Sequence, residues 1–124
     1  MNGVFGELLL VGLGGGFGAM LRYGAALGVS RFAGPSFAAT LLVNVVGCFC
    51  MGWLLASPSE SFGSSRMRLL LGTGVLGGFT TFSTFAADTQ RLATDAGGPA
   101  FGYVAASVIG GLVAFWAGRS LGAA

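Results

Sequence analysis

Four apolar stretches, each close to the length at which a helix crosses a membrane, dominate this 124-residue chain. A helix needs about 20 predominantly apolar residues to span the hydrocarbon core of a bilayer. The stretches run roughly from Val4 to Val29, from Pro35 to Ala56, from Met67 to Leu92 and from Ala100 to Leu121. The connections between them are too short to hold a soluble domain. We therefore expect residues 1–124 to form one all-α transmembrane domain of four helices.

Charged residues are too scarce in this sequence to cover a water-soluble surface. Only 8% of the residues are charged, and the chain has neither Lys nor His, so its expected surroundings are the lipid bilayer. Six Arg against four acidic residues give a net charge of +2, too small and too dispersed for a nucleic-acid-binding surface. Because the usual general bases and metal ligands are nearly absent, an enzyme is not expected.

The first apolar stretch has neither the basic segment nor the small-residue cleavage site of a secretory signal, so we expect it to remain as a membrane helix. Cys48 and Cys50 lie two residues apart in the second stretch, where a helix points their side chains in different directions. A disulfide between them would have poor geometry. Both are interpreted as small core residues.

Glycine supplies 24 of the residues, many of them three or four positions apart within the spans. Lipid provides no hydrophobic force between helices, so membrane helices associate through small residues that allow close backbone approach. The spacing therefore predicts tight helix packing. The glycines concerned are Gly12, Gly14, Gly15, Gly16, Gly18, Gly47, Gly110 and Gly111.

The six arginines are balanced between the two ends of the spans. If both termini lie on one side of the membrane, each side receives three arginines, and the positive-inside rule gives no preferred orientation. Copies inserted both ways up can pair about a two-fold axis in the membrane plane, which predicts dual topology and an antiparallel homodimer. The two sets are Arg66, Arg68 and Arg119 on the side of the termini, and Arg22, Arg31 and Arg91 on the other.

The third span contains the densest polar run, from Gly77 to Phe85 (GGFTTFSTF). Polar groups in hydrocarbon are expensive and are often functional. Two adjacent glycines followed by hydroxyl residues weaken a helix, and a broken helix exposes carbonyl groups that need a cation or water. The alternative is an unbroken helix whose hydroxyl groups bond back to the preceding turn.

Two phenylalanines of this run, Phe82 and Phe85, are three residues apart and share a helix face. An aromatic ring has a positive edge, so rings that present their edges to a pore attract a small anion without a countercharge that would trap it. The alternative is that both rings contact lipid or pack against other helices.

The second and fourth spans also carry polar pairs. Asn44 follows Thr40 by one turn on the same face, and Tyr103 and Ser107 lie four residues apart. The amide of Asn44 either bonds helices together or donates to a permeating anion. The face of Tyr103 and Ser107 either packs against a partner or lines a narrow path.

Two charged residues lie within the first and third apolar stretches, beyond their glycine-rich and hydroxyl-rich parts. Arg22 is either an interfacial arginine that reaches toward water or the positive mouth of an anion pathway. Asp88 follows Phe85 by one turn, and it either lies at the membrane interface or pairs with an arginine of a neighbouring chain.

These features together resemble the Fluc family of fluoride channels, also called CrcB, across all four spans. The likeness is carried by Gly14 to Tyr23 (GGGFGAMLRY), Thr40 to Gly47 (TLLVNVVG), Gly77 to Phe85, and Tyr103 with Ser107. Its most specific part is the TTFSTF sequence within the third of these segments.

The resemblance implies an antiparallel homodimer in a bacterial cell membrane, with two fluoride pores and a structural Na+ held at the two-fold axis by carbonyl groups of the broken third helices. Fluoride would leave the cytoplasm passively, after neutral HF has entered and ionised. The Na+ site maps to Gly77 and Thr80, with the adjacent Gly78 and Thr81 as alternatives. The fluoride pathway maps to Phe82, Phe85, Asn44, Tyr103 and Ser107, extended by Thr40, Ser83 and Thr84.

Two positions depart from the family pattern. Ala39 stands where members often have Gly, and Gly111 stands where many have a second hydroxyl group one turn after Ser107. A small dual-topology, proton-coupled multidrug exporter is the alternative function, because it also uses four spans and a chain of similar length. It would need a titratable carboxylate deep in the membrane, and the candidate in the first span, Glu7, lies too near its start.

Overall fold

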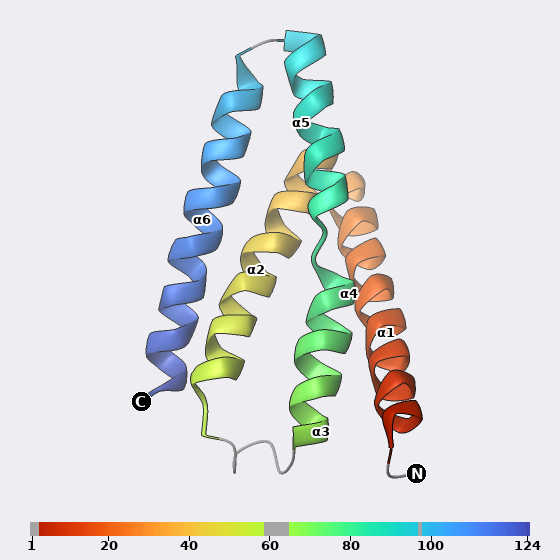
Figure 1. Cartoon of the computed structure of the whole chain (residues 1–124). Helices are drawn as coiled ribbons and strands as arrows, with labels where there is room; N and C mark the ends of the chain where they lie inside the picture. The colour runs from red at the N-terminus through yellow and green to blue at the C-terminus, as the bar shows by residue number, and fades with distance from the viewer. Residues whose placement is uncertain (1–2, 59–64, 97) are drawn as a thin grey trace.

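The fold is a bundle of four helical spans, shown in Figure 1. The computed structural model describes residues 3–58, 65–96 and 98–124. The first, second and fourth spans are the continuous helices α1 (Val4–Arg31), α2 (Ser36–Ala56) and α6 (Pro99–Gly122). Each of the four spans is long and apolar enough to cross a membrane, and their ends lie within a few residues of the predicted ones. The chain is a multi-pass membrane protein.

The third span is broken near its middle, as predicted. Its backbone leaves the helical conformation at Thr80, where φ is −84° and ψ is 159°. Figure 1 shows the resulting extended link, at about half the height of the bundle. The segments of this span are α3 (Ser65–Arg68), a π-helical segment η2 (Leu69–Leu76), α4 (Gly77–Phe79) and α5 (Phe82–Ala96).

The glycine pair of the third span has a different role from the predicted one. Gly77 is itself helical, with φ −63° and ψ −36°, and the break falls three residues later. A Cβ atom at Gly78 would overlap with the backbone carbonyl group of Gly15 in α1. At Gly78 the absence of a side chain therefore lets α4 approach α1. The extended link itself is formed by Thr80 and Thr81.

Two helix pairs make up most of the packing, α2 with α6 and α1 with the first half of the third span. A Cβ atom at Gly52 of α2 would overlap with the carbonyl group of Phe115, and one at Gly118 of α6 would overlap with that of Phe49. Gly18 of α1 meets Val75 in the same way. Close approach through small residues is thus confirmed as the means by which these helices associate.

The individual glycines divide into two groups. Gly14, Gly18 and Gly47 lie in buried contacts, whereas added Cβ atoms at Gly12 and Gly16 would meet nothing within 4 Å. Gly111, where the family pattern favours a hydroxyl residue, faces Cys48, and an added Cβ atom would lie 3.4 Å from its Sγ atom. A methyl group at position 111 would therefore lie in ordinary van der Waals contact with Cys48.

The outer surface of the bundle is apolar along its length. Among the described residues Val43 is the one large side chain that is fully buried, while many Leu, Phe and Val side chains are exposed. Such a surface suits a lipid environment. The start of α1 and the end of α6 lie at the same end of the bundle (Figure 1). Arg31 is in the last turn of α1 and Arg119 is in the last turn of α6, so these two arginines lie at opposite ends of the bundle, as the sequence indicated.

Candidate functional site

The break in the third span borders a cavity of about 320 Å³. The cavity brings together residues from both predicted sets, the Na+ ligands and the fluoride pathway. Phe82 forms part of its wall and is 80% exposed. The lining residues are Asn44, Gly47, Cys48, Met51, Leu76, Gly77, Thr80, Thr81, Phe82 and Phe115.

Asn44 holds the break open through two hydrogen bonds to the backbone of Thr81. The Thr81 N–H group donates to Asn44 Oδ1 over 2.8 Å, and Asn44 Nδ2 donates to the Thr81 carbonyl group over 3.0 Å. Because the Thr81 N–H group is engaged by Asn44, it is not available to the carbonyl group of Gly77, its partner in a continuous helix. Asn44 therefore bonds two helices together, which was one of the two interpretations of this amide.

A cluster of hydroxyl groups starts α5. The Thr81 Oγ1 atom accepts a hydrogen bond from the backbone N–H group of Thr84 over 3.2 Å, as an N-cap residue does. The same atom lies 3.1 Å from Thr84 Oγ1 and 3.2 Å from Ser83 Oγ. Ser83 and Thr84 are exposed on the surface of the single chain at the middle of the span. Polar side chains at that depth need water, an ion or another chain beside them.

Four aromatic rings form a continuous series next to the break. The ring of Phe82 lies 5.4 Å from that of Phe85, and Phe85 lies 5.5 Å from Tyr103. Tyr103 in turn makes an edge contact with Phe37, at 5.6 Å. The series runs from the exposed Phe82 to Tyr103, which is 5% exposed. The two phenylalanines are neighbours as predicted, whereas Phe37 carried no signal in the sequence.

In the predicted polar pair of α6, Tyr103 is buried and Ser107 is half-buried. In the described part of the chain, the hydroxyl oxygen atoms of Tyr103 and Ser107 are buried and have no hydrogen-bond partner. The nearest polar neighbours of the Tyr103 hydroxyl group are Ser107, Thr40 and Asp88, although none of them meets the geometric criteria for a hydrogen bond to it. Buried polar groups nearly always have a partner, so these two atoms are positions at which water can bind.

A second cavity has a volume of about 380 Å³. Thr81 lines both cavities. Arg22, the predicted pore mouth, lines this second cavity together with Thr40 and Thr84 of the predicted pathway. Its full lining is Ala19, Arg22, Tyr23, Ala26, Ser36, Ala39, Thr40, Val43, Thr81, Thr84, Asp88 and Arg91.

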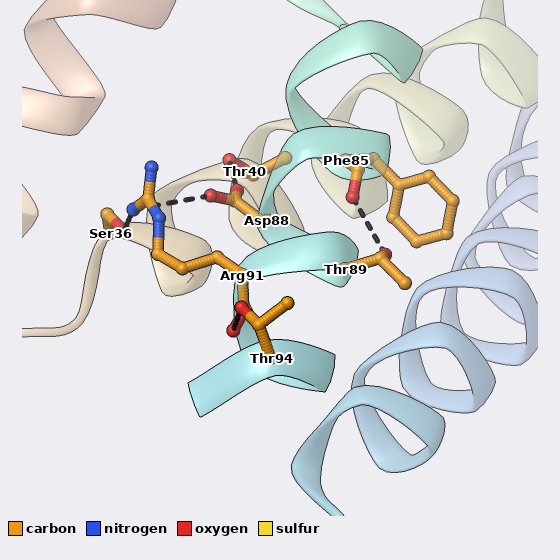
Figure 2. A network of polar contacts seen from close by, with 7 residues as sticks. All are labelled: Ser36, Thr40, Phe85, Asp88, Thr89, Arg91 and Thr94. Carbon is orange, nitrogen blue, oxygen red and sulfur yellow. Dashed lines mark hydrogen bonds and ion pairs between the residues drawn. The ribbon is translucent and has the colours of Figure 1, made fainter. Parts of the chain in front are cut away.

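Asp88 is a buried carboxylate on the wall of this second cavity. Thr40 Oγ1 donates to Asp88 Oδ2 over 2.7 Å, and Arg91 Nη1 lies 3.9 Å from Asp88 Oδ1 (Figure 2). Figure 2 also shows Arg91 reaching toward Ser36, whose Oγ atom accepts a hydrogen bond of 3.0 Å from Nη1. The arginine that pairs with Asp88 thus comes from the same chain, three residues later. This pair was not predicted from the sequence, although a spacing of three residues on a helix is a signal for it.

The predicted residues therefore gather in one region of the bundle, around the two cavities and the ring series. Asn44, Phe82 and the proposed Na+ ligands border the first cavity, and Thr40, Thr84 and Arg22 border the second. Tyr103 and Ser107 are not among the lining residues of either cavity, but Thr40 and Asp88 of the second cavity are neighbours of the Tyr103 hydroxyl group.

Known proteins match almost the whole chain. The family model described as "CrcB-like protein, Camphor Resistance (CrcB)" matches residues 9–119. A protein of Mesorhizobium japonicum is 45% identical over 93% of this chain and 98% of its own length. Proteins of Gloeobacter violaceus and Chloroflexus aurantiacus are 44% and 42% identical, covering 90% and 94% of this chain and 92% and 94% of their own lengths. All three are named "Fluoride-specific ion channel FluC". With a match of this extent, the chain belongs to the CrcB family.

Proposed function

We propose that this chain forms a fluoride-selective ion channel in the cell membrane of a bacterium. The observation that carries the proposal is its identity of 42–45%, over nearly its full length, to proteins named fluoride-specific ion channels. Those names also support the prediction that the chain is not an enzyme. The channel exports fluoride from the cytoplasm passively, along its electrochemical gradient.

The active form is an antiparallel homodimer with two pores. Phe82, Ser83 and Thr84 are exposed at mid-span in the single chain, beside a broken helix. Irregular backbone at this depth is tolerated where protein or water covers it, and not where it faces lipid. A second copy of the chain supplies that cover, and the equal division of arginines between the two ends allows copies of both orientations to insert.

Fluoride passes along the ring series and the hydroxyl groups beside it. The positive edges of Phe82 and Phe85 attract the ion weakly, and the hydroxyl groups of Tyr103 and Ser107 donate hydrogen bonds in place of water. Weak and repeated contacts suit conduction, because an ion held by a single strong partner leaves slowly.

A structural Na+ lies at the two-fold axis, between the broken helices of the two copies. The carbonyl groups of Gly77 and Thr80 are its candidate ligands, with those of Gly78 and Thr81 as neighbours. The hydrogen bond from Thr81 to Asn44 leaves the Gly77 carbonyl group without its usual helical partner. Carbonyl oxygens are the ligands that hard cations prefer.

The test is fluoride release from liposomes that contain the purified protein. Liposomes loaded with potassium fluoride are diluted into fluoride-free buffer, valinomycin is added to carry K+, and a fluoride electrode follows the release. A channel predicts rapid fluoride release that requires no proton gradient and far slower chloride release from matched liposomes. Release no faster than from protein-free liposomes, or release that requires a proton gradient, would overturn the proposal.

A further inference from the structure

The second cavity contains a negative charge that an anion pathway would not be expected to include. The side chain of Asp88 is 5% exposed and lies on the cavity wall, with Thr40 donating to one of its oxygen atoms. A buried carboxylate repels an anion over several ångströms, because little water screens it. An anion that passes this wall needs a compensating positive charge close to Asp88.

Arg91 supplies a positive charge in the required place. Its Nη1 atom lies 3.9 Å from Asp88 Oδ1 and donates to Ser36 Oγ, at the start of α2, over 3.0 Å. The bond to Ser36 joins α5 to α2 and fixes the guanidinium group over the carboxylate (Figure 2). The side chain is 60% exposed, so it lies between the buried acid and the water at that end of the bundle.

We propose that Arg91 is a positioning residue for anion passage, which acts by neutralising Asp88 and so lets a small monovalent anion occupy the second cavity. This inference rests on the proposed fluoride channel. With Arg91 in place, the charged residues that line the cavity are Arg22, Arg91 and Asp88, with a net positive charge. Without it, the positive charge of Arg22 is cancelled by Asp88, and the cavity loses its attraction for anions.

The expected effect follows from Coulomb's law. We take the anion in the second cavity and the Arg91 guanidinium group as unit charges about 8 Å apart, at an effective dielectric constant of about 20. Loss of the Arg91 charge then lowers the occupancy of the cavity by the anion by roughly 30-fold. Solvent exposure of Arg91 and dissolved salt reduce this effect. We expect the loss of the Arg91 charge to slow fluoride release by roughly 3- to 10-fold at low ionic strength.

Four variants separate charge from structure, each reconstituted as the full-length protein at equal density. Arg91→Gln removes the positive charge and keeps a hydrogen-bond donor for Ser36, whereas Arg91→Lys keeps the charge. The double variant combines Arg91→Gln with Asp88→Asn. It removes both charges, and the Asn side chain keeps an acceptor for Thr40. Arg31→Gln is the matched control, because it removes an exposed charge from the end of α1, away from the cavity lining. Size-exclusion chromatography establishes that each variant is folded.

Fluoride release is measured at ionic strengths of about 0.03 M and about 0.5 M, set with an impermeant salt, which shortens the screening length from about 18 Å to about 4 Å. The Na+ concentration is the same in both buffers. We expect Arg91→Gln to be slow at low salt and close to parental at high salt. Arg91→Lys, the double variant and Arg31→Gln are expected near the parental rate throughout.

Parental release by Arg91→Gln at low salt would overturn the inference while leaving the channel intact. A deficit of the same size at both ionic strengths, or one that the double variant does not repair, would also overturn it, because either result indicates a structural role. The inference would also be overturned if Arg91→Gln does not fold and the double variant folds but releases fluoride slowly. A parental protein that releases no fluoride would contradict both this inference and the proposed function.

Discussion

Replacement of Asn44 by Leu is expected to destabilise the protein strongly, because this amide is the side chain that holds the break in the third span. Asn44 engages both backbone polar groups of Thr81, at 2.8 and 3.0 Å. Leu has the same branched shape but can form neither bond. An unsatisfied backbone group costs about 1–3 kcal/mol. Water that enters the adjacent cavity offsets part of this cost, so we expect the free energy of unfolding to fall by about 2–4 kcal/mol.

The assay is unfolding in mixed micelles with increasing SDS, followed by circular dichroism at one protein concentration, since the stability of a dimer depends on concentration. Gln90→Leu is the matched control, because it makes the same amide-to-leucine change on an exposed position of α5. The control is expected to shift stability by less than about 0.5 kcal/mol. A shift of that small size for Asn44→Leu as well would refute the conclusion that Asn44 maintains the break.

Four further predictions concern the pathway, the packing, the cation and the topology. Phe82→Ile and Phe85→Ile are each expected to keep the parental size-exclusion profile and to slow fluoride release by about tenfold, the effect of losing one aromatic contact. If both variants fold and release fluoride at the parental rate, the two rings serve only in packing. Gly78→Val should abolish recovery of folded protein, because of overlap with α1, whereas Gly12→Val should not; equal recovery would refute this packing. Replacing Na+ by N-methylglucamine should lower the melting temperature more than Thr80→Ala does, since backbone oxygens hold the ion. A melting temperature that does not depend on Na+ would contradict the proposed site. Tags at the termini should be accessible from both sides of sealed vesicles, and several Lys added to one loop should select one orientation; a single orientation in the parental protein would contradict dual topology.

The four spans and the broken third span could be predicted because their signals are local in the sequence. Length and apolarity define a membrane helix from about 20 consecutive residues. The threonine pair after two glycines indicated a weak point, and the structure breaks at these threonines. The position of the break depends on Asn44, which is 37 residues away from Thr81, so the sequence indicated a break but not what stabilises it.

The parts of the site that the sequence did not reveal are contacts between different helices. Whether Asp88 pairs with its own chain or a neighbour depends on how α5 lies against α2, where Thr40 and Ser36 meet Asp88 and Arg91. The contact of Tyr103 with Phe37 likewise depends on how α6 and α2 pack. Hydropathy and helical periodicity describe one segment at a time and contain no information on such pairings.

Electrical recording under bi-ionic conditions measures directly whether the protein is a channel that selects fluoride. The purified protein is placed in a planar bilayer with sodium fluoride on one side and an equal concentration of sodium chloride on the other. The zero-current voltage is expected to shift toward the fluoride equilibrium potential by about 59 mV for each tenfold preference for fluoride. A steady current with a zero-current voltage near zero would indicate a pore that does not distinguish the two anions, and no current above that of a protein-free bilayer would indicate no channel; either result would contradict the proposed function.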